Sequence, residues 1–213
     1  FYKDKLKLKS NLDGFIEKKS SQNNFSEKLI IKEEYINQII DNVFTKNNFK
    51  QKLFDLTGFN YSIDFLLAYS NYNINEVNVE NDIYANHWHK DKPFSKNTLK
   101  VIIPVNEILN NNGPMEIISI KDSNKVNFFS NLKKIDFPNK FKLTGTEEDV
   151  FFFLPNLCYH RAGIPSSGQK RTQIMLQLNP SKKWRYSINL YKKQYLLEPK
   201  FPAFNFRDDY KLI

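Results

Sequence analysis

The chain has 213 residues, of which 32 are Lys or Arg and 23 are Asp or Glu, so its formal net charge is +9. Hydrophobic residues make up 40% and aromatic residues 15% of the chain, which excludes wholesale disorder because this much aromatic area can form a core. No apolar run approaches the roughly 20 residues that a membrane-spanning helix requires. A single Cys excludes an intrachain disulfide framework and a Cys-rich zinc site.

The distribution of charge and the first residues bear on partners and location. The opening residues Phe1–Ser10 lack the apolar core of a signal peptide, which together with the single Cys predicts a reducing, cytoplasmic location. The basic residues are spread from Lys3 to Lys211 and are nearly all Lys. Proteins that read nucleic acids rely on Arg for base contacts, and this chain has only four Arg. The composition therefore argues against nucleic acid as a binding partner. A nucleic-acid-associated protein remains the weakest of the alternatives.

The first part of the chain, residues 1–58, is predicted to be helical. Ser26 suits the N-cap of a helix entered by Glu27, and apolar residues follow at steps of three to four. These apolar positions are Leu29, Ile36, Ile39, Ile40 and Val43. A second helix is expected from Phe49 to Leu56, with Gly58 at its end.

After Gly58 the pattern changes to short runs of β-branched and aromatic residues between turn-forming clusters. Continuous apolar runs such as VIIPV and VFFFL are typical of strands buried on both faces. The predicted strands are Ile63–Tyr69, Ile83–His89, Leu99–Val105, Met115–Ile120, Val150–Leu154 and Gln173–Leu178.

This order of elements predicts a mainly β fold with N-terminal helices, a double-stranded β-helix of the jelly-roll, cupin-like kind. A parallel α/β sheet is disfavoured because helical patterns do not alternate with the strands. We expect a single domain over residues 1–213. Within it, residues 59–180 would form the jelly-roll core and residues 181–213 an aromatic, basic tail packed on the outside.

The segment from Asn86 to Asp91 carries a candidate metal site. In an extended strand, residues two apart point to the same face, so His89 and Asp91 project together, as does His87. Two imidazoles and one carboxylate form a facial triad that leaves three positions open on Fe(II). The only His elsewhere is His160, which follows the VFFFL run. Strand alternation does not by itself choose between His87 and His89.

Eleven residues after His160 lies Arg171, at the start of another buried strand. A buried guanidinium requires an anionic partner, and its planar fork suits a carboxylate. That partner is either an acidic side chain of the protein or a bound ligand.

Together these segments resemble the Fe(II)/2-oxoglutarate-dependent oxygenases, and most closely the phytanoyl-CoA dioxygenase family. The segment HWHKD at 87–91 resembles the W-H-x-D strand of that family. LKVIIPVNEILNNNGPMEII at 99–118 resembles its strand and NNGP segment. EEDVFFFLPNLCYHRAG and KRTQIMLQL, within 147–178, resemble the strand with the second His and the strand with the co-substrate Arg. The likeness covers roughly residues 80–185.

The resemblance implies that His89, Asp91 and His160 bind Fe(II) and that Arg171 holds the distal carboxylate of 2-oxoglutarate, with O2 as co-substrate. His87 would then lie outside the triad, beside the ligands or the substrate, or simply packed. Tyr84 and Asn86 are candidates for polar contacts with co-substrate or substrate, although strand alternation would place Tyr84 opposite His89.

The implied activity is oxidation of a small organic substrate, with hydroxylation favoured and desaturation or cyclisation as alternatives. In place of the Pro-Gly-Ser-His turn of the family, this chain has Ile118–Ser123. This departure motivates a second hypothesis, a non-catalytic jelly-roll binding or interaction protein derived from an oxygenase. A metal-dependent cupin without a co-substrate is a further alternative, and it would leave Arg171 without a ligand.

Overall fold

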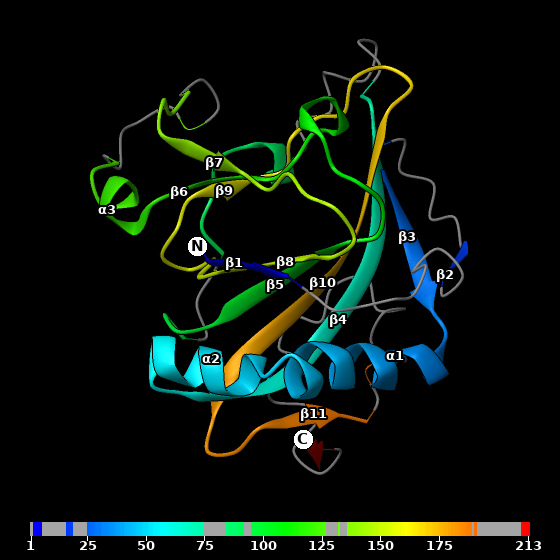
Figure 1. Ribbon diagram of the computed structural model, residues 1–213. Coiled ribbons are helices and arrows are strands. Elements are labelled where there is room, and N and C mark those ends of the chain that lie inside the picture. The colour runs from blue at the N-terminus through cyan, green and yellow to red at the C-terminus, as the bar shows by residue number, and fades with distance from the viewer. Residues whose placement is uncertain are drawn as a thin grey trace.

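The protein is mainly β, and its strands form two sheets that face each other (Figure 1). The computed structural model describes residues 2–5, 16–18, 25–74, 84–91, 95–126, 132, 136–188, 190 and 210–213. The prediction of a mainly β chain with helices near the N-terminus is confirmed. Among the described residues, no helix combines the length and the apolar character that crossing a membrane would require.

The large sheet runs in the order β1-β8-β5-β10-β4-β11-β12, and β3, which is paired with β2, also pairs with β4. Its long central strands β4 and β10 pair in antiparallel fashion, whereas β11 runs parallel to β4. Its strands are β1 (Tyr2–Lys5), β2 (Ile16–Lys18), β3 (Ser26–Ile31), β4 (Asn60–Tyr72), β5 (Leu99–Pro104), β8 (Asp149–Phe153), β10 (Lys170–Ser181), β11 (Arg185–Ser187) and β12 (Tyr210–Leu212).

The small sheet has the order β7-β6-β9 and consists of short antiparallel strands. These strands are β6 (Glu116–Ile118), β7 (Lys140–Lys142) and β9 (His160–Arg161). Short helical segments η4 (Tyr84–Asn86), η5 (Asn110–Asn112) and α3 (Ile120–Ser123) lie in the connections.

One face of the large sheet is covered by helices (Figure 1). These are α1 (Glu33–Ile40), the π-helical η2 (Asp41–Lys46) and α2 (Phe49–Thr57), which ends at Gly58 in a left-handed conformation. Their buried side chains, such as Ile39, Phe44 and Phe49, pack on residues of β4, β5, β8 and β10. This contact forms the larger of the two apolar clusters found among the described residues.

A second apolar cluster fills the space between the two sheets. It includes Ile102 of β5, Phe151 and Phe153 of β8, and Ile117 of β6, with Met175 of β10 packed against it. Because side chains alternate along a strand, residues in step with these also face the space between the sheets. On β10 this set includes Arg171 and Gln173, and on β5 it includes Lys100.

The prediction of a helical segment over residues 1–58 is wrong for its first half. Ser26 does not cap a helix but begins strand β3, and α1 begins only at Glu33. Leu29 and Ile31 are buried two residues apart, a strand period, because β3 pairs with β4. The helical period holds from Ile36 onward, and the second predicted helix is confirmed as α2.

Among the strands, Ile83–His89 is the clearest error. Tyr84–Asn86 forms the 3₁₀ segment η4 instead, and Ile83 lies outside the described residues. The predicted strand Met115–Ile120 is shorter than expected, because Ser119 caps the helical turn α3 by accepting a hydrogen bond from Asp122 N. In the predicted tail, Trp184 packs its ring on Phe44 and Tyr61, whereas residues 191–209 lie outside the described part.

Candidate metal centre and anion site

The three predicted metal ligands come together between the sheets, at a point where two loop-borne segments are joined. His89 and His160 form an isolated antiparallel bridge in which each backbone N–H donates to the carbonyl of the other, at 3.0 and 2.9 Å. Asp91 N donates to Pro155 O at 3.1 Å, which fixes the carboxylate-bearing end of the same segment. Main-chain hydrogen bonds therefore hold together two segments whose residues His89 and His160 are 71 positions apart in sequence.

The ligand atoms of these side chains converge. Oδ1 of Asp91 lies 3.4 Å from Nε2 of His160 and 3.7 Å from Nε2 of His89. One ligand atom from each residue falls within 4.8 Å of the others, a grouping that could hold a metal ion. Nε2 of His160 is buried and has no hydrogen-bond partner among the described residues. A buried polar atom without a partner is costly, and a bound cation would satisfy it.

The other nitrogen of each imidazole is held by the backbone. Nδ1 of His89 donates to the His87 carbonyl at 2.7 Å, and Nδ1 of His160 donates to the Cys158 carbonyl at 3.1 Å. A carbonyl oxygen only accepts, so each Nδ1 carries the proton and each Nε2 keeps its lone pair. This is the tautomer that a metal bound at Nε2 requires.

The electrostatics of the cluster favour neutral imidazoles beside an ionised carboxylate. Burial, followed by the neighbouring His160, lowers the pKa of His89 to about 4. Burial also lowers the pKa of His160. Burial raises the pKa of the Asp91 carboxyl, but its contacts with His160 and Lys100 outweigh burial and leave that pKa below its usual range. At neutral pH these are the protonation states of metal ligands.

The lowered histidine pKa values predict that the metal-free protein loses stability in mild acid. The unfolded chain takes up a proton on His89 near its ordinary pKa of 6.5, whereas the folded chain does so only near 4. The stabilisation is therefore complete above about pH 6.5 and falls by about 3 kcal/mol as the pH drops toward 4. Urea unfolding in EDTA at pH 7.5 and pH 4.5 measures the difference.

His89→Gln serves as the control for this titration, and it should show a shallower loss because, of the two histidines with a lowered pKa, only His160 remains. Equal stability of the wild-type protein at the two pH values would contradict the assignment of buried, neutral imidazoles.

Arg171 lies in the same space between the sheets and is fully buried. Its Nη1 donates to the carbonyls of Gly113 and Gly163, and its Nη2 donates to Oδ1 of Asn71 at 2.6 Å. Its Nε is buried without a hydrogen-bond partner among the described residues. Burial lowers its pKa from the ordinary value.

Two glycines make the cradle of Arg171 possible. A Cβ on Gly113 would lie 2.4 Å from the backbone of Ile164, and one on Gly163 would lie 2.3 Å from Pro114 O. Because both positions exclude a side chain, the two loops approach closely and their carbonyls converge on the guanidinium. Gly163 is three residues beyond His160, so at most about 11 Å of extended chain separates their Cα atoms.

Of the remaining predicted residues, Tyr84 and His87 contact His89. The Tyr84 ring lies 4.7 Å from the His89 ring, centroid to centroid, and is 64% exposed. Strand alternation, which would have placed Tyr84 opposite His89, does not apply because this segment is helical. Oδ1 of Asn86 is buried and has no hydrogen-bond partner among the described residues. His87 contributes its carbonyl to His89.

Sequence reasoning missed one charged residue of this cluster. Nζ of Lys100 lies 2.6 Å from Oδ2 of Asp91, and its side chain is only 12% exposed. Lys100 opens the apolar run of β5 on the face shared with Ile102. A cation at an inward-facing position of a strand buried on both faces was the signal that could have identified it.

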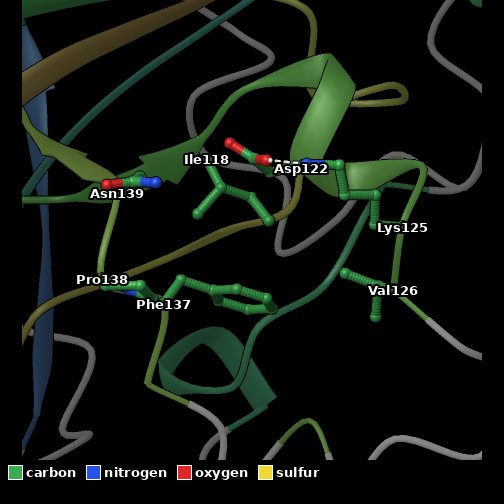
Figure 2. A pocket seen from close by; sticks show the side chains of 7 residues that line it. All are labelled: Ile118, Asp122, Lys125, Val126, Phe137, Pro138 and Asn139. Carbon is green, nitrogen blue, oxygen red and sulfur yellow. Dashed lines mark hydrogen bonds and ion pairs between the residues drawn. The ribbon is translucent and has the colours of Figure 1, made fainter.

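A separate pocket of about 250 Å³ lies beside α3. Figure 2 shows Ile118, Val126 and Phe137 converging on it, with Asp122 and Lys125 from α3 and the turn after it at the rim. Ile118 follows Ile117, which packs between the sheets and pairs with His160. Strand alternation therefore places this pocket on the outer face of the small sheet, away from the metal cluster.

Comparison with solved structures defines the class of fold. No protein-family model matches the chain, and no curated protein matches its sequence. HygX from Streptomyces hygroscopicus, solved with nickel, 2-oxoglutarate and hygromycin B bound, is similar at a TM-score of 0.54 and 10% identity, over 84% of this chain and 82% of HygX. SnoN, a non-heme alpha-ketoglutarate-dependent epimerase from nogalamycin biosynthesis, is similar at a TM-score of 0.50 and 14% identity, over 78% of this chain and 67% of SnoN. At these identities the similarity concerns the fold.

Proposed function

We propose that this protein is an Fe(II)- and 2-oxoglutarate-dependent oxygenase that oxidises a small organic substrate, hydroxylation being the favoured outcome. Its phytanoyl-CoA dioxygenase-like motifs and the fold that it shares with HygX and SnoN support this assignment. We further propose that the chain is one domain whose two facing sheets are those of a double-stranded β-helix.

The observation that supports the proposal most strongly is that two buried polar atoms without a hydrogen-bond partner among the described residues lie in the space between the same two sheets. Within the described part of the chain, Nε2 of His160 faces Oδ1 of Asp91 without a hydrogen bond, and Nε of Arg171 is buried without an acceptor. The donor set of two imidazoles and one carboxylate suits Fe(II). A guanidinium with a spare N–H suits a carboxylate. A dicarboxylic 2-oxo acid satisfies both, because one end can bind a metal and the other an Arg.

In this assignment His89, Asp91 and His160 hold the metal, and Arg171 holds the distal carboxylate of 2-oxoglutarate. Bound there with O2, iron and the oxo acid would supply an oxidising reaction that yields succinate and CO2 while oxidising a C–H bond of the substrate. The protein contributes binding, orientation and shielding from water. The backbone bonds at Nδ1 keep both Nε2 atoms aimed at the ion. Tyr84, whose ring lies beside that of His89, and Asn86 are the candidates for polar contacts with substrate or co-substrate.

Anaerobic addition of Fe(II) and then 2-oxoglutarate to the purified protein tests the proposal. We expect a weak visible charge-transfer band that requires both additions, followed under air by slow formation of succinate even without a substrate. A band without succinate would favour the alternative of a non-catalytic binding protein, which the replacement of the expected turn by α3 motivates. Absence of both the band and metal binding would refute the assignment.

A further inference from the structure

Lys100 occupies an unusual position for a cation. It lies two residues before Ile102 on β5, so the two side chains point to the same face of the sheet. Ile102 belongs to the apolar cluster between the sheets, and the Lys100 side chain therefore enters that space. Its β8 partner in the register is Phe153, whose ring lies 5.2 Å from that of His160. A largely buried ammonium in such surroundings requires a specific partner.

That partner is the carboxylate of Asp91, and the two oxygens of this group are divided between different neighbours. Oδ2 lies 2.6 Å from Nζ of Lys100. Oδ1 faces the imidazoles, at 3.4 Å from His160 Nε2 and 3.7 Å from His89 Nε2. The oxygen turned toward the metal position is therefore not the one that the ammonium holds.

We propose that Lys100 is a positioning residue of the metal centre: its ammonium occupies Oδ2 of Asp91, so that the carboxylate offers the ion Oδ1 alone. The inference rests on the proposed function, since it requires a metal held by His89, Asp91 and His160. Two imidazoles and one carboxylate oxygen leave three positions of an octahedral ion open. A carboxylate that chelates through both oxygens would leave only two. An oxo acid that binds through two atoms would then occupy every remaining position.

The charge of Lys100 acts on metal and co-substrate in opposite directions. An ammonium close to the cluster repels a divalent cation and competes with it for Asp91, but it attracts a dianion once the ion is bound. Removing Lys100 is therefore expected to strengthen metal binding and weaken 2-oxoglutarate binding. A residue that only stabilised the fold would move both affinities in the same direction.

The test uses Co(II) as the metal probe, with titration followed by its visible absorption. In Lys100→Met, we expect Co(II) to bind about 3-fold or more tightly than in wild type, and 2-oxoglutarate to bind the Co(II)-loaded protein at least about 10-fold more weakly. The Co(II) spectrum should also change, because the carboxylate becomes free to chelate. Lys100→Arg should keep both affinities within about 3-fold, since a guanidinium can donate to Oδ2. Lys182→Met, an exposed position, is the matched control and should behave as wild type.

Lys100→Gln covers the possibility that Lys100→Met does not fold, which thermal melting will reveal. Its amide can still donate to Oδ2 without the charge, so the Co(II) spectrum should match wild type while Co(II) binds more tightly. The role of Lys100 is refuted, while the metal site stands, if a folded Lys100→Met keeps the wild-type Co(II) spectrum and binds Co(II) and 2-oxoglutarate within about 2-fold of wild type. Affinities within about 2-fold of wild type in Lys100→Gln would refute it equally. If wild-type protein binds no Co(II), the proposed function itself fails.

Discussion

Replacing His160 with Ala is expected to abolish retention of Fe(II) or Co(II) while leaving a folded protein. The substitution removes one of three ligands, so metal affinity should fall by more than the roughly 10- to 100-fold that loss of an outer partner costs. The imidazole is almost fully buried and its ring contacts Phe153, so its loss should also lower the free energy of unfolding by about 2 kcal/mol. Equilibrium dialysis against Co(II) and urea unfolding measure the two effects separately.

His87→Ala is the matched control for this experiment. His87 supplies a backbone carbonyl to His89, and that carbonyl survives the substitution. The variant should therefore bind Co(II) as wild type does. Normal metal affinity in His160→Ala, or loss of affinity in His87→Ala, would mean that the ligands are assigned wrongly.

Replacing Arg171 with Met is expected to remove 2-oxoglutarate binding without removing the metal. The guanidinium is fully buried, and its Nε is left for a ligand, so 2-oxoglutarate affinity should fall at least about 100-fold. The carbonyls of Gly113 and Gly163 lose their hydrogen-bond donor, so the free energy of unfolding should fall by about 2–3 kcal/mol. Co(II) affinity should stay within about 3-fold of wild type, because Arg171 contacts none of the three ligands.

Pyruvate separates ligand binding from a structural role of Arg171. It carries the same 2-oxo acid group as 2-oxoglutarate but lacks the distal carboxylate, so its binding to the metal-loaded protein should barely change in Arg171→Met. Arg171→Lys retains a cation without the planar fork and should lose about 10-fold in 2-oxoglutarate affinity. An equal loss of pyruvate and 2-oxoglutarate binding in both variants would indicate that Arg171 only supports the fold.

The strands that sequence patterns predict well are those buried on both faces. The runs around Ile102 and Phe152 are continuously apolar because helices cover one face of the large sheet and the small sheet covers the other. Strand β3 was predicted as helix because Leu29 lies seven residues before Ile36, a spacing that fits a helical stripe. This segment forms a strand because it pairs with β4, which lies more than 30 residues away in the sequence. No local sequence pattern contains that contact.

The resemblance to the oxygenase family, rather than spacing alone, anticipated that His89, Asp91 and His160 would lie together, but not how. His89 and Asp91 were expected to share a strand face, whereas a 3₁₀ segment, one bridge and the Asp91–Pro155 hydrogen bond position them. Tyr84 lies against His89 for the same reason. Lys100 was not predicted because a Lys near the end of a strand is usually exposed. Its place two residues before Ile102 was the signal for an inward position, and its contact with Asp91 bears that position out.

The hydrogen bonds that orient both imidazoles end on main-chain carbonyls, those of His87 and Cys158. A carbonyl is common to all residue types, so no change of side chain at either position can delete the acceptor. The tautomers of the ligands are thereby insulated from mutation in the walls around them. Substitutions among the side chains around the two imidazoles would therefore leave the orientation of His89 and His160 unchanged.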